Sequence, residues 1–404
     1  MLRNTLLLTL PLVLVLPLRA ANSDGESRRI LTLANGQVIR VLSRETAGGW
    51  QYKAREGWKD LEANQVVHVT SESEALAAWN KKSGAIDRKK IEERVGLARY
   101  GIENGLVQEA LLELDAVLTA EPDYFGAREL LTKNNLMNVP SVAVAPEQRA
   151  GALDLLFRWA APMPPAAREL AVNQLGKFED HEALRTALEK ELRSNIVLRR
   201  SFGALALRRL CPKEALRPLV LHSIYDASEE VRTNSALALK ASNEPGVVLP
   251  LVRVIEDSPS PALRSNAAES LGVMGYANAV EPIVARLANE AAGGASSGER
   301  LPHSYIFVGT QIAYVQDFDV QVAQFQAVAD PQINTLIEGS TLETAVMGVQ
   351  QVDFAVEQAT MRSALEKLTR ASPGKTTKDW LAWWKLNGDK WMTGVVATQS
   401  KEQG

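Results

Sequence analysis

Apolar positions in the middle of the chain recur with a helical spacing, and the whole pattern returns at nearly equal intervals along the sequence. The stretch at 182–188, EALRTAL, is echoed at 214–220 as EALRPLV, and apolar runs return at 247–252 and at 279–284. Two helical patterns that alternate at a period within the roughly 20–50 residues of repeat folds predict a stacked helix-pair solenoid. Such a fold presents a long surface rather than an enclosed pocket, so the pattern favours a binding function.

Short apolar runs separated by turn signals precede the helices and predict a small β domain at 28–70. The Asn-Gly pair at 35–36 is a hairpin signal between two runs rich in β-branched residues. Four or five short strands with glycine turns are typical of a small SH3-like barrel. Such barrels can bind peptides on aromatic residues, here Trp50, Tyr52 and Trp58, but core packing is the interpretation that we prefer for these side chains.

A polar and basic segment at 71–84, which we interpret as a linker, separates the β domain from helical spacing at 85–138. The run at 105–111, GLVQEAL, and the later Pro122-Asp123 resemble a tetratricopeptide repeat (TPR). In that pattern, small residues let two helices approach and the proline ends the second helix. Because one helical pair cannot bury both of its faces, we expect this TPR-like pair to stack on the solenoid as an adaptor.

The solenoid is predicted to occupy 147–290, where an Arg near a helix start recurs at nearly equal intervals. These arginines are Arg168, Arg199, Arg232 and Arg264. The run 226–232, DASEEVR, followed by Ala-Leu at 236–237, resembles HEAT repeats, in particular the short kind also found in phycobilisome-lyase-type proteins. The resemblance implies a mainly α fold, a HEAT-like α-solenoid. It says little about activity.

The resemblance to HEAT repeats also implies a structural role for some charged residues. In that family, the Asp and Arg of successive repeats form a ladder of hydrogen bonds between neighbouring units. By this resemblance, Asp226, Arg232, Asp257 and Arg264 are structural. A repeat position that recurs on one edge is also most simply explained by contact between repeats.

Three further segments follow the solenoid. Residues 291–302 are predicted to form a Gly/Ser loop, and 303–350, rich in β-branched and aromatic residues, a β insertion. Residues 353–395 are predicted to form a helical cap, in which Trp380, Trp383 and Trp384 share a helix face. A Trp-rich helix can hide the last apolar face of a solenoid. The alternative is that Trp383 and Trp384 form an exposed aromatic platform for a sugar or a peptide.

The N-terminus has the pattern of an export signal. Arg3 precedes an apolar run at 6–18, and Ala20-Ala21 follow at the place where a signal peptidase cuts. We therefore predict a signal peptide at 1–21 and an exported chain, in the periplasm or cell envelope, with no integral membrane span after cleavage. A retained N-terminal anchor is the alternative. The single cysteine, Cys211, excludes an intramolecular disulfide.

The sequence carries no recognisable catalytic or metal-binding motif. The four histidines are scattered, without the spacing of a helical zinc site, and neither a phosphate-binding loop nor a nucleophile elbow occurs. We therefore expect no catalytic residues, no metal and no cofactor. The net charge of −3 gives no global field that favours nucleic acid or lipid, so we expect no nucleic-acid partner.

One basic cluster, at Arg199, Arg200, Arg208 and Arg209, suggests a binding surface for an acidic protein or an anionic glycan. Together, the modules resemble exported HEAT-repeat proteins of planctomycete-type bacteria. The leading hypothesis is a non-enzymatic scaffold that binds another macromolecule, a protein, along its solenoid. The alternatives are a phycobilisome-lyase-like enzyme that handles a chromophore and an envelope-polysaccharide binder that uses Trp383 and Trp384.

Overall fold

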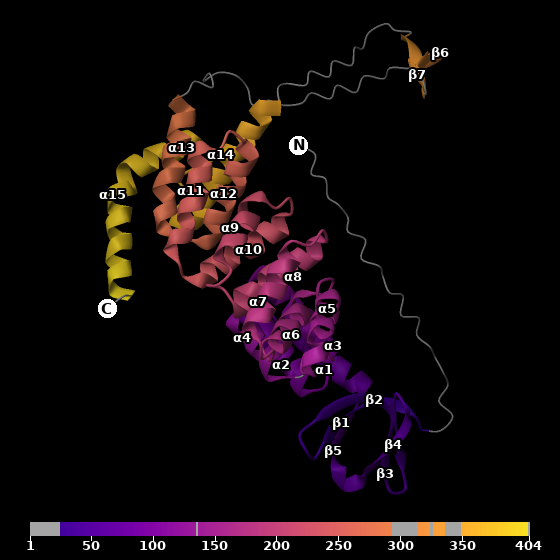
Figure 1. Cartoon of the computed structure of the whole chain (residues 1–404). Helices are drawn as coiled ribbons and strands as arrows, with labels where there is room; N and C mark the ends of the chain where they lie inside the picture. The colour runs from indigo at the N-terminus through magenta and orange to yellow at the C-terminus, as the bar shows by residue number, and fades with distance from the viewer. Residues whose placement is uncertain (1–24, 135, 293–312, 324–325, 336–348, 403–404) are drawn as a thin grey trace. The chain divides into compact units, whose positions relative to one another are not determined.

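A computed structural model of the chain describes residues 25–134, 136–292, 313–323, 326–335 and 349–402 (Figure 1). The predicted signal peptide at 1–21 and residues 293–302 of the predicted Gly/Ser loop lie outside this described part. The chain is mainly helical and divides into two compact units, 1–144 with 163–174 and 145–162 with 175–404. Among the described residues, no helix combines the length and the apolar character that crossing a membrane requires.

The first unit begins with a five-stranded antiparallel sheet. Its strand order is β4-β3-β2-β1-β5, and a single 3-10 turn, η1 (Ala63–Gln65), precedes the last strand. The β1–β2 hairpin turns at Asn35 and Gly36, where Gly36 has φ +82° and the Gln37 N–H donates to Asn35 Oδ1 at 2.9 Å. The strands are β1 (Ser27–Leu33), β2 (Val38–Thr46), β3 (Gly49–Ala54), β4 (Gly57–Glu62) and β5 (Val66–Ser71).

The register of β3 and β4 determines which of the three aromatic residues of the sheet share a face. Lys53 lies opposite Trp58, whereas Tyr52 lies opposite Lys59. Because neighbouring residues of a strand face opposite sides of a sheet, Trp58 lies on the other face from Trp50 and Tyr52. The guanidinium of Arg44 lies 4.4 Å from the ring centroid of Trp58. A ligand on one face of the sheet could therefore not contact all three aromatic residues.

Residues 71–84 are not a linker, because helix α1 (Glu72–Ala85) occupies this segment. The Ser71 hydroxyl accepts from the Glu74 N–H and the Glu74 carboxylate accepts from the Ser71 N–H, a capping box that begins the helix. Trp79 is buried in one cluster with Ile30 of the sheet and Leu106 of the helices. The sequence-based prediction missed this helix because most of its surface is polar and its buried apolar face is small.

The remaining helices of the first unit pack around one apolar core. At Gly101, an added Cβ would lie 3.1 Å from Ala110 Cβ, so a small residue there lets α2 and α3 approach closely. The core includes Leu114, Leu131 and Leu170. The helices are α2 (Ile91–Glu103), α3 (Val107–Ala120), α4 (Phe125–Lys133) and α6 (Pro165–Leu175), whose residues up to 174 belong to this unit.

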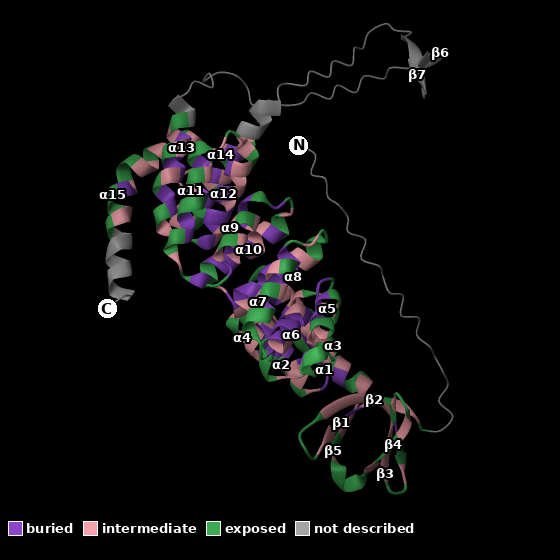
Figure 2. Cartoon of the chain, viewed as in Figure 1, coloured by how far each residue is buried: buried purple, intermediate pink, exposed green. Residues whose placement is uncertain are grey.

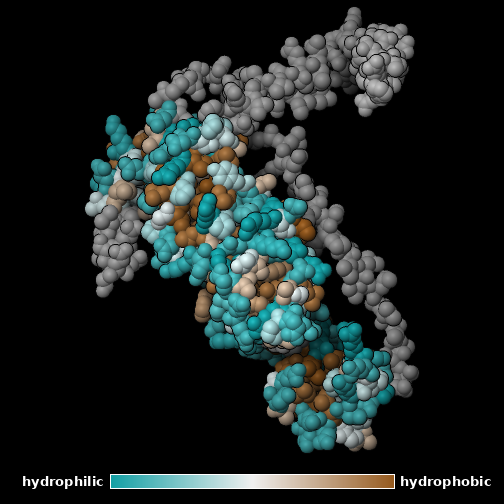
Figure 3. Space-filling view, in the orientation of Figure 1, coloured by the Kyte–Doolittle hydropathy of each residue, from teal (hydrophilic) through white to brown (hydrophobic). Residues whose placement is uncertain are grey.

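The second unit contains helix pairs stacked side by side, with buried residues running through their centres (Figure 2). Apolar residues gather between its helices, and hydrophilic residues cover much of the visible face (Figure 3). Helix α8 packs on α10, and α10 packs on α12. The helices are α5 (Arg149–Ala160), α7 (His181–Leu192), α8 (Val197–Leu210), α9 (Leu216–Tyr225), α10 (Glu229–Ser242), α11 (Val248–Asp257), α12 (Pro261–Met274) and α13 (Val280–Ala292).

The helix starts correct the register of the repeated arginines. Helices α6, α8, α10 and α12 begin at 165, 197, 229 and 261, which are evenly spaced positions. The arginine in step with Arg232 and Arg264 is therefore Arg200, and not Arg199 as the sequence suggested. The sequence alone did not decide which of the two adjacent arginines is the repeated one, because a shift by one position still gives nearly equal intervals.

Two strands and two helices follow α13. Strands β6 (Ala313–Ala323) and β7 (Gln326–Thr335) pair in antiparallel fashion within the predicted β insertion. Residues 303–312, 324–325 and 336–348 of the predicted insertion lie outside the described residues. Val349 begins helix α14 (Val349–Thr369). Helix α14 packs on α12, as α12 packs on α10, so it continues the stack of helices.

The C-terminal helix α15 (Thr377–Glu402) packs on α13. Its cap is Thr376, because the Thr376 hydroxyl accepts from the Asp379 N–H and the Asp379 carboxylate accepts from the Thr376 N–H. Trp380 is 2% exposed, so the N-terminal turn of α15 covers apolar surface.

Candidate functional site

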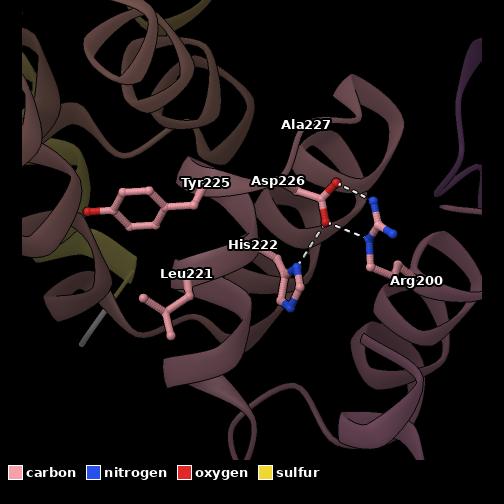
Figure 4. Close-up of a pocket in the computed structure, with 6 residues that line it drawn as sticks. All are labelled: Arg200, Leu221, His222, Tyr225, Asp226 and Ala227. Atoms are coloured by element: carbon pink, nitrogen blue, oxygen red, sulfur yellow. Dashed lines mark hydrogen bonds and ion pairs between the residues drawn. The ribbon is translucent and has the colours of Figure 1, made fainter. Parts of the chain in front are cut away.

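A hollow of about 260 Å³ on the second unit brings together residues of α8, α9 and the turn that follows α9 (Figure 4). A buried carboxylate and an arginine lie on one side of the hollow, and two exposed apolar side chains lie on the other. The lining residues are Arg200, Leu221, His222, Tyr225, Asp226 and Ala227.

Asp226 organises the polar side of the hollow. It follows the last residue of α9, and its carboxylate accepts from Arg200 Nε at 2.8 Å and from Arg200 Nη2 at 2.9 Å. The Ser228 N–H also donates to it, at 2.9 Å. Burial raises the pKa of Asp226, but the hydrogen bonds from Arg200, Ser228 and His222 outweigh burial and lower the pKa to about 2. The carboxylate is therefore ionised and held in place.

His222 lies one turn before Asp226 on α9, with its Nδ1 3.0 Å from Asp226 Oδ2. Because an ionised carboxylate can only accept, Nδ1 carries the proton of this hydrogen bond. The other ring nitrogen, Nε2, points away from Asp226 (Figure 4). Asp226 thus fixes the orientation of the His222 ring and leaves Nε2 outside this hydrogen bond.

Arg200 belongs to a ladder that follows the period of the repeats. In each of three repeats, the arginine on the second helix donates to a backbone carbonyl six residues before it. These bonds are Arg200 Nη1 to Ser194 O at 2.9 Å, Arg232 Nη1 to Asp226 O at 3.1 Å and Arg264 Nη1 to Ser258 O at 2.6 Å. Each arginine therefore closes the turn of its own repeat.

The same three arginines also reach a carboxylate further along the chain. Arg200 binds Asp226, Arg232 Nη2 lies 3.2 Å from Glu269 Oε2, and Arg264 Nη2 lies 2.6 Å from Glu357 Oε2. Of the residues that the HEAT resemblance implied, Asp226, Arg232 and Arg264 take part in these bonds. Asp257 is exposed, and Ser258 occupies the turn position that Asp226 holds one repeat earlier. The two turns, 226–228 and 258–260, have the same length, so Asp257 is the last residue of α11 and lies one position before the ladder position.

Leu221 and Tyr225 form an apolar ridge on the outward face of α9. They are one helical turn apart, and they are 49% and 56% exposed. In α11, the equivalent positions of the next repeat carry Arg253 and Asp257, both exposed. A repeat position that is apolar in one copy and charged in the next is not needed to hold the repeats together. Comparing the exposed positions of successive repeats could have revealed this ridge from the sequence.

The predicted basic cluster does not form one surface. Arg199 Nη2 donates to Glu191 at 2.7 Å and to Asp154 at 3.1 Å, and Arg200 binds Asp226. Arg208 is only 3% exposed, and its burial together with the charge of Arg209 lowers its pKa to about 9. The prediction is wrong for Arg208, because a buried side chain cannot contact an acidic partner. Arg209 is half-buried.

A larger hollow of about 1430 Å³ lies among α5, α7 and the first turn of α8. Arg199 lines it, but the lining mixes both signs of charge. The basic residues there include Arg149 and Lys190, and the acidic ones include Asp154 and Glu182. A hollow of mixed charge does not select an anionic polymer.

The tryptophans of α15 do not form a flat platform. Trp383 and Trp384 are half-buried, and their ring centroids lie 6.3 Å apart with the planes inclined by 38°. Trp384 and Trp391 lie 6.1 Å apart at 58°. Inclined indoles pack against one another as aromatic side chains do in cores. This geometry favours packing over the stacking of a sugar ring.

Within the described residues, no group of three or more His, Cys, Asp or Glu side chains could hold a metal ion. Cys211 is buried, and burial raises the pKa of its thiol. A raised thiol pKa lowers the thiolate fraction that a nucleophile requires.

Comparison with known proteins finds a recognised kind of repeat that includes the α9 ridge. The family model of HEAT repeats matches residues 214–295, which include α9 to α13. No curated protein and no solved structure matches the chain. HEAT repeats generally mediate protein–protein interaction. Residues 214–295 are thus similar to HEAT repeats, and α9, with its exposed ridge, lies at the start of the matched segment.

Proposed function

We propose that this chain is a non-enzymatic scaffold whose HEAT repeats bind a protein partner at the α9 ridge and the adjoining hollow. The observation that carries the proposal is the pair of exposed apolar side chains, Leu221 and Tyr225, beside a fixed ion pair. Large side chains that bury on contact dominate the energetics of protein interfaces, and tyrosine is enriched among them. HEAT repeats present their surfaces for such contacts.

The size of the hollow favours a protein segment over a small molecule. Its volume of about 260 Å³ lies below the roughly 300–1,000 Å³ that is typical of small-molecule sites. A hollow of this size accepts one side chain of a partner. We expect an apolar side chain to pack between Leu221 and Tyr225, and a polar group beside it to bond to His222 Nε2.

The polar groups of the hollow support binding rather than catalysis. The Asp226 carboxylate accepts from Arg200, Ser228 and His222 at once, and its pKa of about 2 keeps it ionised. A carboxylate held in this way orients His222 but does not exchange a proton near neutral pH. The lyase-like alternative would show itself as a coloured chromophore that copurifies with the chain.

The other modules add to the proposed scaffold. We infer that the sheet is an SH3-like barrel, since its strands follow the order β4-β3-β2-β1-β5 with a 3-10 turn before β5. We infer that α2 and α3 form the TPR-like pair, since Gly101 and Ala110 bring them close together. From the export pattern at 1–21 we infer a scaffold of the periplasm or cell envelope, with a retained anchor as the alternative.

The test is capture of a partner by the full chain with a photo-reactive amino acid at Tyr225. The binding of the captured protein to the wild-type chain is then compared, by competition, with its binding to two single variants. Leu221→Asp changes the ridge, and Leu249→Asp is the matched control, since Leu249 is 60% exposed on α11. We expect one captured protein, with binding at least about tenfold weaker for Leu221→Asp, a change of about 1.4 kcal/mol.

Equal binding by all three chains would place the interface elsewhere on the molecule. Equal loss in both variants would indicate nonspecific sensitivity to charge. Retention on an anionic glycan without a captured protein would replace the proposal with the polysaccharide-binding alternative.

A further inference from the structure

The start of α8 carries three large aliphatic residues where the equivalent turns of the next two repeats carry none. Ile196, Val197 and Leu198, which we call the α8 step, are 55%, 40% and 39% exposed. Because α8, α10 and α12 begin at 197, 229 and 261, the equivalent positions hold Ser-Glu-Glu at 228–230 and Ser-Pro-Ala at 260–262. The contacts between repeats therefore do not require the aliphatic side chains of the step.

The α8 step also lacks the cap with which the equivalent helices begin. The Ser228 hydroxyl accepts from the Val231 N–H at 3.5 Å, and the Ser260 hydroxyl accepts from the Leu263 N–H at 3.4 Å. Ile196 occupies the same position in α8, and its side chain makes no cap hydrogen bond. Serine is among the residues that stabilise a helix start, and isoleucine is not. The step is thus not the sequence that best stabilises α8, which favours a role in binding.

The α8 step adjoins the hollow of about 1430 Å³ among α5, α7 and the first turn of α8. Ser194 and Asn195, directly before the step, line this hollow. Its lining also includes the buried apolar side chains of Leu153, Phe157 and Phe178. The volume exceeds the roughly 300–1,000 Å³ of small-molecule sites, so the hollow can take several side chains of a protein segment.

The unpaired charge of the hollow is positive and lies at the end next to the step. Lys190 and Arg193, at the C-terminal end of α7, line the hollow, are exposed and pair with no carboxylate among the described residues. Each carboxylate that lines the hollow, in contrast, already accepts a hydrogen bond. These carboxylates are Asp154 and Glu191, which bond to Arg199, Glu182, which bonds to Arg185, and Asp180, which caps α7.

We propose that the α8 step and the adjoining end of the hollow bind a segment of the protein partner in which large apolar residues and carboxylates occur together. The apolar side chains of the segment cover the step, and its carboxylates pair with Lys190 and Arg193. A uniformly anionic polymer does not fit, because it would place unpaired charge against the apolar step. That the partner is a protein rests on the proposed function, to which the step adds a second contact surface.

Arg200 connects the step to the α9 ridge. Its Nη1 donates to Ser194 O, two residues before the step, at 2.9 Å. Its Nη2 donates to Asp226, in the hollow at the ridge, at 2.9 Å. The two surfaces are therefore held in a fixed relation by one side chain, and a single partner can contact both.

The first experiment selects a phage-displayed library of random peptides on the full chain. Peptides that enrich are resynthesised with a fluorophore, and their binding is measured by fluorescence anisotropy. We expect them to combine large apolar residues with Asp or Glu. Leu198→Glu, which gives α8 the residue that α10 has at the equivalent position, should weaken their binding at least about tenfold. The matched control is Leu249→Glu, since Leu249 is 60% exposed on α11.

Ile196→Ser separates binding from folding. Serine supplies the cap that α10 and α12 have, so this variant should melt about 2–4 °C above the wild type. It should nevertheless bind the same peptides about tenfold more weakly, because it removes an apolar side chain of the step. A loss of binding in a more stable chain does not result from misfolding.

Lys190→Glu tests the charge of the step. It should weaken the peptides with carboxylates at least about tenfold, and replacing their Asp and Glu by Lys should restore binding to this variant. Lys385→Glu is the matched control, because Lys385 is exposed on α15. Equal weakening by the two variants would overturn the pairing with Lys190.

Leu221→Asp, measured in parallel, distinguishes the step from the α9 ridge. Peptides that this variant loses but Leu198→Glu binds as well as the wild type would support the ridge and overturn the step. Peptides that only Leu198→Glu loses would support the step and count against the ridge. Enriched peptides without carboxylates, or a selection that enriches no peptide, would overturn the proposal.

Discussion

Arg264 on α12 and Glu357 on α14 form a buried ion pair, although they are 93 residues apart in the chain. Arg264 Nη2 lies 2.6 Å from Glu357 Oε2, and the side chains are 4% and 0% exposed. Arg286 approaches the same carboxylate at 3.8 Å. The pair joins the matched HEAT segment to the helices that follow the β6–β7 hairpin.

Removing one partner of this pair is expected to destabilise the second unit strongly. Glu357→Gln should lower the free energy of unfolding by about 3–5 kcal/mol, because Arg264 would remain buried without its countercharge. Urea unfolding of the full chain measures the loss. The control is Glu182→Gln, since Glu182 pairs with Arg185 on the surface and an exposed pair contributes little to stability. Equal losses in both variants would contradict the special role of the buried pair.

Asp226 is expected to make the stability of the second unit depend on pH in the acidic range. Its pKa is about 2 in the folded chain, below the ordinary value of 3.8, so folding favours the ionised form. The contribution is therefore complete above about pH 4 and is lost as the pH falls toward 2. Thermal unfolding of wild type and Asp226→Asn between these pH values tests this. The variant should be less stable near neutral pH and should lose less stability on acidification. Parallel pH profiles would count against this role for Asp226.

Trp380 is expected to be the tryptophan of α15 that stabilises the fold. It is 2% exposed, so Trp380→Ala should cost about 3–5 kcal/mol through lost burial and the cavity left behind. Leu386→Ala is the control on the same helix, because Leu386 is 76% exposed. Chemical denaturation of both variants gives the comparison. A cost below about 1 kcal/mol for Trp380→Ala would show that α15 does not cap the solenoid.

Gly272 is expected to set the distance between α12 and α14. A Cβ added there would lie 3.0 Å from Ala364 Cα and 3.2 Å from Ala364 Cβ. Gly272→Val should therefore destabilise the chain by about 1–3 kcal/mol through overpacking. Gly151→Ala in α5 is the contrasting change, since nothing lies within 4 Å of its Cβ and the helix should gain about 0.5–1 kcal/mol. Relative to the wild type, the denaturant midpoint should shift down for Gly272→Val and up for Gly151→Ala, and shifts in these opposite directions would support the prediction.

The sequence predicted the repeat architecture well, because the period of the repeats is a property of apolar spacing. It did not resolve the ladder register, because Arg199 and Arg200 are adjacent and only the helix starts distinguish them. The helix at 72–85 was missed, because Ala75 and Trp79 supply its buried face and the rest of its surface is polar. Local composition does not reveal a contact that forms only when Trp79 meets Ile30.

The candidate site could be predicted only in part, because the sequence does not show which charged residues become paired or buried when the helices pack. The cluster of positive charge in the sequence predicted a binding surface that included Arg199, Arg200 and Arg208. In the folded chain, each of these three charges is either paired or buried. Burial and pairing depend on partners distant in the chain, and composition cannot supply them. The exposed pair Leu221 and Tyr225 could have been found in the sequence only by comparing equivalent positions of successive repeats, because taken alone they are ordinary apolar residues of a helix.

The separation of α13 from α14 along the chain changes how the C-terminal helices are retained. Between them lie residues 293–348, and the entropy of closing such a loop rises only with the logarithm of its length. The length of the backbone link therefore matters little for holding α14 in place, and Glu357 and Ala364 contact α12 directly. In this sense α14 and α15 behave as an intramolecular ligand of the solenoid. The hairpin between them can change in length or sequence without altering the repeats.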